Sequence, residues 1–170
     1  MDKFNVLEFV KTQCVKVNSP LRYLPDESRF CWDDATSVSL PTQSGVYFLL
    51  SHNDTKIQKI GKAEGRGGLK GRLRGYTAKK TPHKINTDKT DQLWREKMTN
   101  HLLGESISVF YYETSPMEIK KSYIQGNVEH SLVVEAQWAR SLEKKLSRLA
   151  AQDVKERGVT YEEMLLSGQN

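Results

Sequence analysis

Apolar and polar residues follow two different patterns along this chain. One pattern is typical of β-strands and the other of α-helices. Residues 46–50 are apolar or aromatic and predict a strand, and the polar residues 51–54 that follow have the chemistry of a turn. Residues 56–62 follow this turn, and the simplest interpretation is that they form a β-hairpin with the first run. Residues 106–112 form a third β-rich run. We therefore expect three strands.

We expect helices in three further segments. Residues 69–76 predict a short helix after a glycine-rich run. Residues 91–103 also have helical spacing, with Asp91 as an N-cap and Gly104 as a stop. The longest apolar stripe alternates spacings of four and three and predicts one long amphipathic helix. Its members are Val128, Leu132, Glu135, Ala139, Leu142, Leu146 and Leu149.

The order of these elements is β-β-α-α-β-α. It predicts an α+β fold, a compact domain with a three-stranded antiparallel sheet flanked by helices. A chain of 170 residues suffices for one domain with a substantial core, which we assign to residues 44–150. Residues 1–43 form an N-terminal extension, with an amphipathic start and a proline-broken, loop-rich remainder. Residues 151–170 form a tail with a weak helix around residues 161–166.

Composition excludes several classes of protein. Hydrophobic residues make up 37% of the chain and charged residues 28%, which is typical of a globular protein and not of a disordered one. No apolar run approaches the roughly 20 residues of a membrane span, and the N-terminus lacks a signal-peptide pattern. Cys14 and Cys31 are isolated, which favours two lone thiols in a reduced compartment, although a single disulfide stays open. We expect a cytoplasmic protein without a membrane partner.

Positive charge gathers in one segment. Of the 26 Lys and Arg residues, ten fall within residues 56–84, where Glu64 is the only acid. Such clustering is the electrostatic footprint of a nucleic-acid binder, because Lys and Arg displace counterions from phosphates. A solvated basic surface without a partner is the alternative. The residues that we expect to contact nucleic acid, partly from a basic loop over residues 77–90, are Arg66, Lys70, Arg74, Lys79, Lys80 and Lys84.

Four residues carry side chains suited to phosphate chemistry. Arg72 and Tyr76 lie four residues apart and share a face of the short helix, where a guanidinium can bind a phosphate through two hydrogen bonds. Glu135 interrupts the apolar stripe and needs a partner, either a divalent cation such as Mg²⁺ or a Lys or Arg side chain. Tyr47 is either a core tyrosine with a satisfied hydroxyl or a functional one.

Together these residues resemble the GIY-YIG nuclease superfamily. The first motif appears as Gly-Val-Tyr at residues 45–47, and the second as Lys-Ile-Gly, continued by Lys-Ala, at residues 59–63. Residues 69–76 look like the arginine helix of the family, with a tyrosine four residues after the arginine. Residues 135–138 match its metal-binding glutamate, with an aromatic three residues later. The resemblance covers about residues 43–150, and the expected order of elements agrees with the family's core.

The resemblance implies magnesium-dependent hydrolysis of DNA to 5′-phosphate and 3′-hydroxyl ends. Glu135 would hold one Mg²⁺ or Mn²⁺ at the scissile phosphate. Arg72 would steady the phosphoryl charge, and Tyr47 would activate or orient the attacking water, with Lys62 and Tyr76 in support. Lys59 stands where the family usually has its second tyrosine, so an ammonium would replace a phenol there.

The kind of nuclease follows from what surrounds the motifs. We expect no separate DNA-binding domain after residue 150, so target recognition would come from residues 1–43 and the loop 77–90, or from a partner. This arrangement resembles a small stand-alone type II restriction endonuclease acting on double-stranded DNA, for which a homodimer is a natural arrangement. Two alternatives stay open: a phage-type or repair-type stand-alone DNA nuclease, and a catalytically silent DNA-binding protein on the same scaffold.

Overall fold

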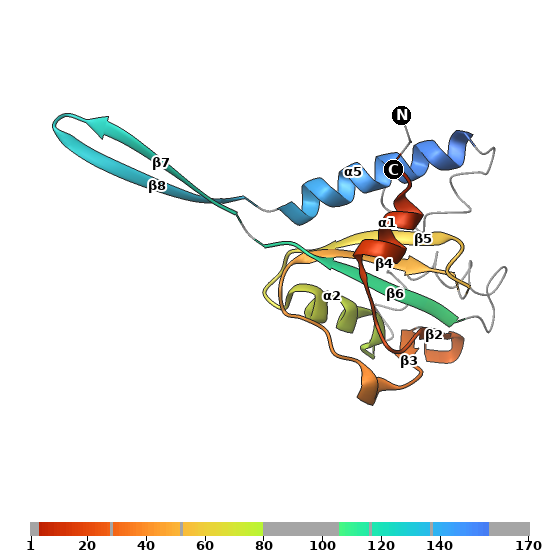
Figure 1. Cartoon of the computed structure of the whole chain (residues 1–170). Helices are drawn as coiled ribbons and strands as arrows, with labels where there is room; N and C mark the ends of the chain where they lie inside the picture. Colours follow the sequence, from red (N-terminus) through yellow and green to blue (C-terminus); the bar gives the residue numbers. More distant parts are fainter. Residues whose placement is uncertain are drawn as a thin grey trace.

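The computed structural model describes residues 4–27, 29–51, 53–79, 106–115, 117–136 and 138–156. The first half contains α1 (Val6–Gln13), β1 (Val15–Lys16), β2 (Leu21–Leu24), the 3-10 turn η1 (Pro25–Glu27), β3 (Arg29–Trp32), η2 (Ala35–Ser37), β4 (Gly45–Leu50), β5 (Ile57–Ala63) and α2 (Gly68–Thr77). The second half contributes β6 (Ser106–Glu113), β7 (Met117–Gln125), β8 (Val128–Ala136) and α5 (Trp138–Glu156) (Figure 1). The helices expected over residues 91–103 and 161–166 lie outside the described residues.

Among the described residues, six strands form one antiparallel sheet in the order β3-β2-β6-β4-β5, with β1 also paired to β6. The α+β class is confirmed, and the three expected strands are β4, β5 and β6. The sheet is larger than expected because residues 1–43 contribute three more strands, so interpreting that segment as loop-rich was wrong. Its prolines bound the strands and do not break them: Pro20 precedes β2, and Pro25 begins the turn that follows.

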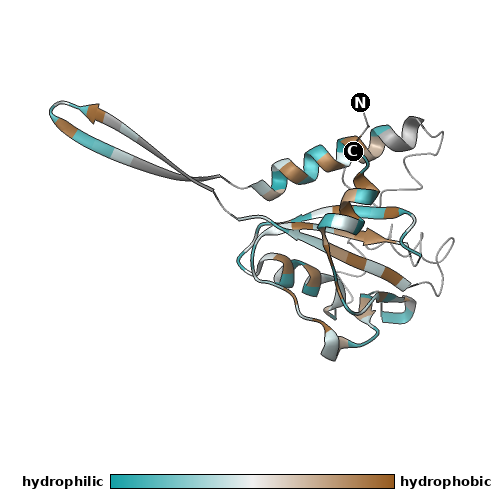
Figure 2. Cartoon of the chain, viewed as in Figure 1, coloured by the Kyte–Doolittle hydropathy of each residue, from teal (hydrophilic) through white to brown (hydrophobic). Residues whose placement is uncertain are grey.

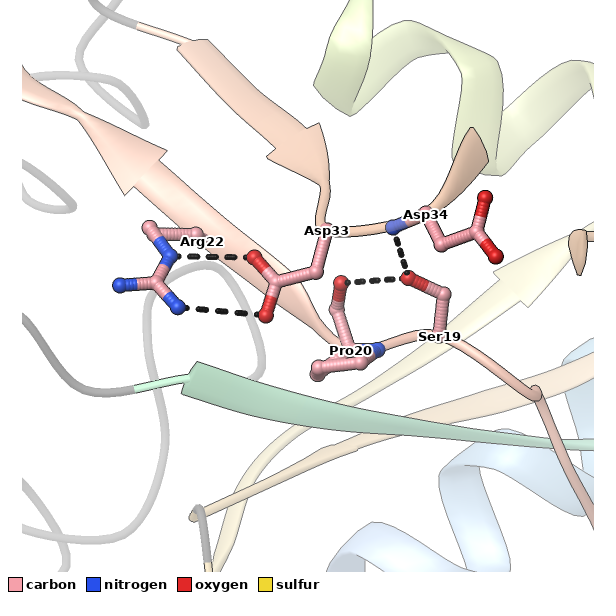
Figure 3. Close-up of polar contacts among 5 residues, drawn as sticks. All are labelled: Ser19, Pro20, Arg22, Asp33 and Asp34. Atoms are coloured by element: carbon pink, nitrogen blue, oxygen red, sulfur yellow. Dashed lines mark hydrogen bonds and ion pairs between the residues drawn. The ribbon is translucent and has the colours of Figure 1, made fainter. Parts of the chain in front are cut away.

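Polar contacts fix the β2–β3 hairpin (Figure 3). Arg22 Nε and Nη2 donate to the two carboxylate oxygens of Asp33 at 3.0 and 3.2 Å, which lowers the pKa of that carboxyl. Ser19 Oγ accepts a hydrogen bond from the backbone N–H of Asp34 at 2.8 Å and donates to the carbonyl oxygen of Pro20 at 3.3 Å. Because the ion pair is exposed, it fixes geometry more than it adds stability.

The strand β4 lies between β6 and β5, and all six of its residues are buried. Helix α2 covers one face of the sheet here, and α1 with α5 covers the other. Successive side chains of a strand point to opposite faces, so Tyr47 and Leu49 pack with Leu69 and Leu73 of α2, whereas Phe48 packs under α1 and α5. This alternation assigns each motif residue of β4 and β5 to one of the two faces of the sheet.

The predicted long helix is wrong over its first half. Val128–Ala136 form β8, which pairs with β7 in a two-stranded hairpin that projects from the body (Figure 1). Gly126 turns the hairpin at a φ of +63°, a conformation that glycine adopts without strain. The spacing of four between Val128 and Leu132 fits one face of a strand as well as one face of a helix, and the valines of β8 favour the strand.

The second half of that prediction is confirmed. Helix α5 begins at Trp138, and the stripe residues Ala139 and Leu146 are buried, while Leu142 and Leu149 are partly buried against the same core. Figure 2 shows polar and apolar positions alternating along this helix. In the described ranges, no helix is both long and apolar enough to cross a membrane.

Candidate active site

Tyr47 lies near the start of β4 and has no solvent exposure. Its hydroxyl is 2.9 Å from the hydroxyl of Tyr76, so the two phenols share a hydrogen bond. The rings meet edge to face with their centroids 6.0 Å apart. Tyr47 is therefore a core tyrosine with a bonded hydroxyl, and that hydroxyl also reaches the arginine helix.

The glycine of the second motif has a definite packing role. Gly61 lies directly opposite Tyr47 in the β4–β5 ladder. A methyl group placed on Gly61 would come closer than 3.0 Å to ring carbons and to the hydroxyl oxygen of Tyr47. Because Gly61 has no side chain, the phenol can cross β5 on the way to α2.

Helix α2 brings two side chains to the Tyr47 hydroxyl. Tyr76 bonds it as described, and Arg72, one turn earlier, donates from Nε to Tyr47 Oη at 3.4 Å, a long hydrogen bond. Leu69 and Leu73 anchor the buried side of the helix. The pair expected to share a helix face therefore converges on one atom.

Lys59 lies on the same face of β5 as Gly61, two residues earlier, and is only 6% exposed. Its Nζ stands 5.7 Å from the centroid of the Tyr76 ring, within range of a cation–π contact. The structure thus brings four of the six predicted catalytic residues together: Tyr47, Lys59, Arg72 and Tyr76. We call these four the tyrosine–arginine centre.

The surroundings of this centre fix the protonation states of the Tyr76 phenol and the Arg72 guanidinium. Burial raises the pKa of Tyr76 well above its usual value of 10.0, and the neighbouring Tyr47 raises it further. Tyr76 is therefore a neutral phenol at physiological pH. Tyr47 also raises the pKa of Arg72, so that guanidinium stays charged. A permanent cation beside the neutral phenol of Tyr76 is suited to binding a phosphate.

Lys62 belongs to a different cluster. It lies on the other face of β5, opposite Val46 in register, and its Nζ is 3.7 Å from a carboxylate oxygen of Glu64. Arg140 of α5 donates to the same oxygen at 3.3 Å. The second oxygen of Glu64 is buried with no hydrogen-bond partner in the part of the chain that the structure describes. The structure therefore places Lys62 in an ion-pair cluster beside α5, apart from the tyrosine–arginine centre.

The N-terminus of α2 is not available as a phosphate site. The backbone N–H groups of Leu69 and Lys70 donate to the carbonyl oxygens of Gln43 and Pro41, each at 2.9 Å. Gly68 makes this close approach possible, because it has a φ of +52° and a side chain there would overlap the backbone of residues 42–43. The glycine-rich run thus serves to dock the helix against the segment before β4.

Glu135 does not lie on a helix. It is on β8, in register opposite Glu118 of β7, so the helical stripe from which we inferred a buried carboxylate does not exist there. The hairpin nevertheless leaves the sheet beside the first motif, because β6 ends at Glu113, which is paired with Gly45. Within the described ranges, no group of three or more His, Cys, Asp or Glu side chains could hold a metal ion.

The expected nucleic-acid contacts lie mostly on one helix and its flanks. Arg66, Lys70, Arg74 and Lys79 are all exposed. Lys70 and Arg74 are one turn apart on α2 and so share a face. Lys80 and Lys84 lie outside the described residues, as does most of the expected loop over residues 77–90.

Sequence reasoning missed two supporting residues on β3. The Phe30 ring meets the Tyr76 ring edge-on with centroids 5.8 Å apart, and Arg29 Nη1 donates to the carbonyl oxygen of Thr77 at 3.0 Å. Both contacts join β3 to the C-terminal end of the arginine helix. No local signal could have revealed them, since they depend on a strand that the sequence did not predict.

Comparisons of the chain with protein-family models, with curated proteins and with solved structures found no match. The GIY-YIG resemblance therefore rests on the motifs and on the contacts among the residues that carry them.

Proposed function

We propose that the chain is a metal-dependent DNA endonuclease of the GIY-YIG type, which hydrolyses phosphodiester bonds to 5′-phosphate and 3′-hydroxyl ends. The observation that carries the proposal is the convergence of Arg72 and Tyr76 on the hydroxyl of Tyr47. The residues come from the first motif and the arginine helix, and the glycine of the second motif makes room for them. Arg72 is exposed, so its guanidinium is accessible to a phosphate.

Each residue of the centre has a chemical role in this proposal. The Arg72 guanidinium would bind the scissile phosphate and stabilise the negative charge that builds during hydrolysis. Tyr76 is only partly buried and is the more accessible phenol, so an attacking water would meet its hydroxyl first. Tyr47 would orient the Tyr76 hydroxyl, and through it that water, by the hydrogen bond between the two hydroxyls. Lys59 would add positive charge behind the Tyr76 ring.

Glu135 would hold Mg²⁺ or Mn²⁺. Carboxylate oxygens are the ligands that these ions prefer, and the hairpin register sets Glu118 opposite Glu135, so the donor chemistry fits. When bound, the ion would polarise the scissile phosphate and stabilise the leaving 3′ oxygen. The departure of β7 beside Gly45 supports a site at the end of the sheet where Tyr47 lies.

Among nucleases, we favour a sequence-specific type II restriction endonuclease acting on double-stranded DNA. Exposed basic residues on α2 and the N-terminal strands beside them would provide contacts to DNA. A phage-type or repair-type nuclease would use the same centre with less sequence preference. The pattern of products separates them, because discrete fragments indicate restriction and a smear indicates degradation.

A second candidate function is DNA binding without catalysis. Two observations favour it: Tyr47 is fully buried beneath its partner, and Lys62 lies on the other face of the sheet. Such a protein would keep the exposed basic face of α2 and would use the tyrosine–arginine centre only to hold that helix in place.

Incubation of the purified chain with plasmid DNA and Mg²⁺ tests these proposals. We expect cleavage by the wild type and loss of cleavage for Arg72→Ala. The matched control is Arg74→Ala, which removes the same charge from the same helix, where the side chain is exposed. Arg74→Ala should weaken DNA binding modestly and keep cleavage.

The outcomes distinguish the two candidate functions. Absence of cleavage by the wild type across divalent metals and pH, with DNA binding retained, would establish the silent binding protein. Equal loss of cleavage in the two arginine variants would show that Arg72 acts only through charge and would remove its assignment to the reacting phosphate.

A further inference from the structure

Helix α5 carries a patch of positive charge outside the basic segment 56–84. Residues 138–152 contain four basic side chains and one acidic one, Glu143. The last turn of the helix, residues 153–156, adds two acids and one lysine and so does not extend the patch. All four basic side chains of the patch are exposed, and they are Arg140, Lys144, Lys145 and Arg148.

Three of these cations lie on one face of the helix. Arg140, Lys144 and Arg148 follow one another at a spacing of four, which places them one turn apart. Leu146 and Ala150 are buried against β4 and β5. At about 100° per residue, the three cations lie roughly 120–200° around the helix axis from Leu146. They therefore point away from the sheet, and we call these three residues the α5 basic face.

The arrangement of charge on this face is unfavourable for the helix itself. Like charges four residues apart repel each other, and successive members of the α5 basic face form such pairs. Arg140 also lies in the first turn, where the helix dipole disfavours a cation, and that turn contains no acid. Alternating signs are the usual pattern of a solvent-exposed helix face. A face that gathers cations against these preferences is suited to binding an anion.

Ion pairs within the chain neutralise little of this charge. Arg140 donates to a carboxylate oxygen of Glu64 at 3.3 Å, and Lys62 Nζ lies 3.7 Å from the same oxygen. One carboxylate therefore faces two cations, and this end of the face stays positive. Lys144 and Arg148 make no ion pair with any residue that the structure describes. Lys62 is partly exposed and extends the positive surface toward β5.

A phosphate backbone fits the α5 basic face. The three cations extend over roughly 12 Å of helix, at about 1.5 Å per residue. Phosphates on one strand of a duplex advance about 3.4 Å each along the axis, so this length covers roughly three or four of them. An anionic membrane is the alternative, but a helix that lies on a membrane needs a free apolar face. The apolar face of α5 is buried in the core through Leu146 and Ala150.

The α5 basic face and the exposed cations of α2 lie on opposite sides of the molecule. Helix α2 covers one face of the sheet and α5 covers the other (Figure 1). Lys70 and Arg74 are the exposed cations that share a face of α2. A DNA duplex is stiff over roughly 150 base pairs, so one short duplex cannot follow both surfaces.

We propose that the α5 basic face binds the phosphate backbone of a second segment of double-stranded DNA, separate from the segment held at α2. The choice of DNA as the polymer rests on the proposed function, whereas the location of the surface rests on the charge, exposure and packing of α5.

Titration of the full chain with a short labelled duplex tests the proposal, in EDTA so that no cleavage occurs. We expect each wild-type chain to bind a second duplex at saturation. Lys144→Gln combined with Arg148→Gln should weaken this second binding event at least about tenfold. Its salt dependence should become shallower by about two, since each lost phosphate contact lowers the slope by about 0.9. Glutamine is a good helix former, so thermal unfolding should show no loss of stability.

The matched control is Lys11→Gln combined with Lys56→Gln. It removes the same charge from exposed positions on α1 and before β5. Because these lysines lie outside the α5 basic face, both binding events should stay within about twofold of the wild type, with an unchanged salt slope.

Three results would overturn the proposal. The first is a single duplex bound per wild-type chain at saturation, and the second is an equal effect of the two double variants, which would leave α5 with a solvated surface. The third is an α5 variant that keeps DNA binding and loses affinity for phosphatidylserine vesicles, which would assign the face to a membrane. A chain that cleaves DNA but binds one duplex would contradict this proposal alone, whereas a chain that binds two duplexes without cleaving contradicts only the proposed catalysis.

Discussion

Gly61 lies opposite Tyr47 in the β4–β5 ladder with no space for a side chain between its backbone and the phenol. The hydroxyl of Tyr47 bonds Tyr76 and accepts from Arg72 only because the ring crosses β5 at this point. The second motif therefore needs a glycine at this position, because a Cβ there would overlap the tyrosine of the first motif.

Gly61→Ala should destabilise the protein by about 1–3 kcal/mol, because overpacking a close-packed core forces side chains or backbone to shift. Equilibrium denaturation measures the change. The control is Gly75→Ala on α2, where nothing lies within 4 Å of the added methyl. That variant should gain roughly 0.5–1 kcal/mol, since alanine is the better helix former. Equal stability of the two variants would contradict the packing role of Gly61.

The pH dependence of stability should report the hydroxyl pair. The pKa of Tyr76 is raised in the folded protein, so the native state holds its proton above pH 10, where the unfolded chain releases it. The free energy of unfolding should therefore be unaffected by this group below pH 10 and fall above it, by up to about 1.4 kcal/mol per pH unit. Thermal melts between pH 8 and roughly pH 11 follow the change.

Comparison with Tyr76→Phe isolates this contribution from other groups that titrate in the same range. The variant should lose stability at neutral pH through the lost hydrogen bond, by roughly 1–3 kcal/mol, and should show a shallower fall above pH 10. A fall of the same slope in both proteins would show that Tyr76 does not titrate with folding.

The N-terminal strand β3 should support the arginine helix. Phe30 is 3% exposed and contacts Tyr76, so Phe30→Ala should cost about 3–5 kcal/mol and reduce cleavage along with stability. The same substitution at Phe4, which is 49% exposed, should cost less than about 1 kcal/mol. Chemical denaturation separates the two. An equal cost at both positions would show that β3 is not part of the folded core.

The sequence predicted which motif residues lie together better than it predicted the fold around them. Tyr47, Arg72 and Tyr76 sit on elements with strong local patterns, and the four-residue spacing on one helix determines which side chains meet. The helix predicted around Glu135 was wrong for the opposite reason, because its first half depended on a spacing of four that strand and helix share. Phe30 and Lys62 depended on strand pairing and on the face of β5, which a sequence specifies only through contacts distant along the chain.

Cys14 should be an inert thiol. Burial raises its pKa from 9.0 to about 12, so almost no thiolate is present at pH 8, and thiolate is the reactive form. Both cysteines are free in the structure, as expected for two lone thiols. Alkylation followed by mass spectrometry should label Cys14 in denatured protein and far more slowly in native protein. Equal labelling rates in the two states would show that the thiol is accessible.

Glu135→Ala separates cleavage from binding. If Glu135 holds the metal, its loss should lower cleavage on the order of 10²–10³-fold, because Lewis-acid stabilisation contributes several kcal/mol and each ~1.4 kcal/mol is a factor of ten. DNA affinity should stay within about twofold by gel shift, since the change removes no positive charge. Lys120→Ala, on the strand that pairs with β8, serves as the control and should keep cleavage. A Glu135 variant that loses affinity and cleavage together would place this residue in the fold of the hairpin and not at a metal.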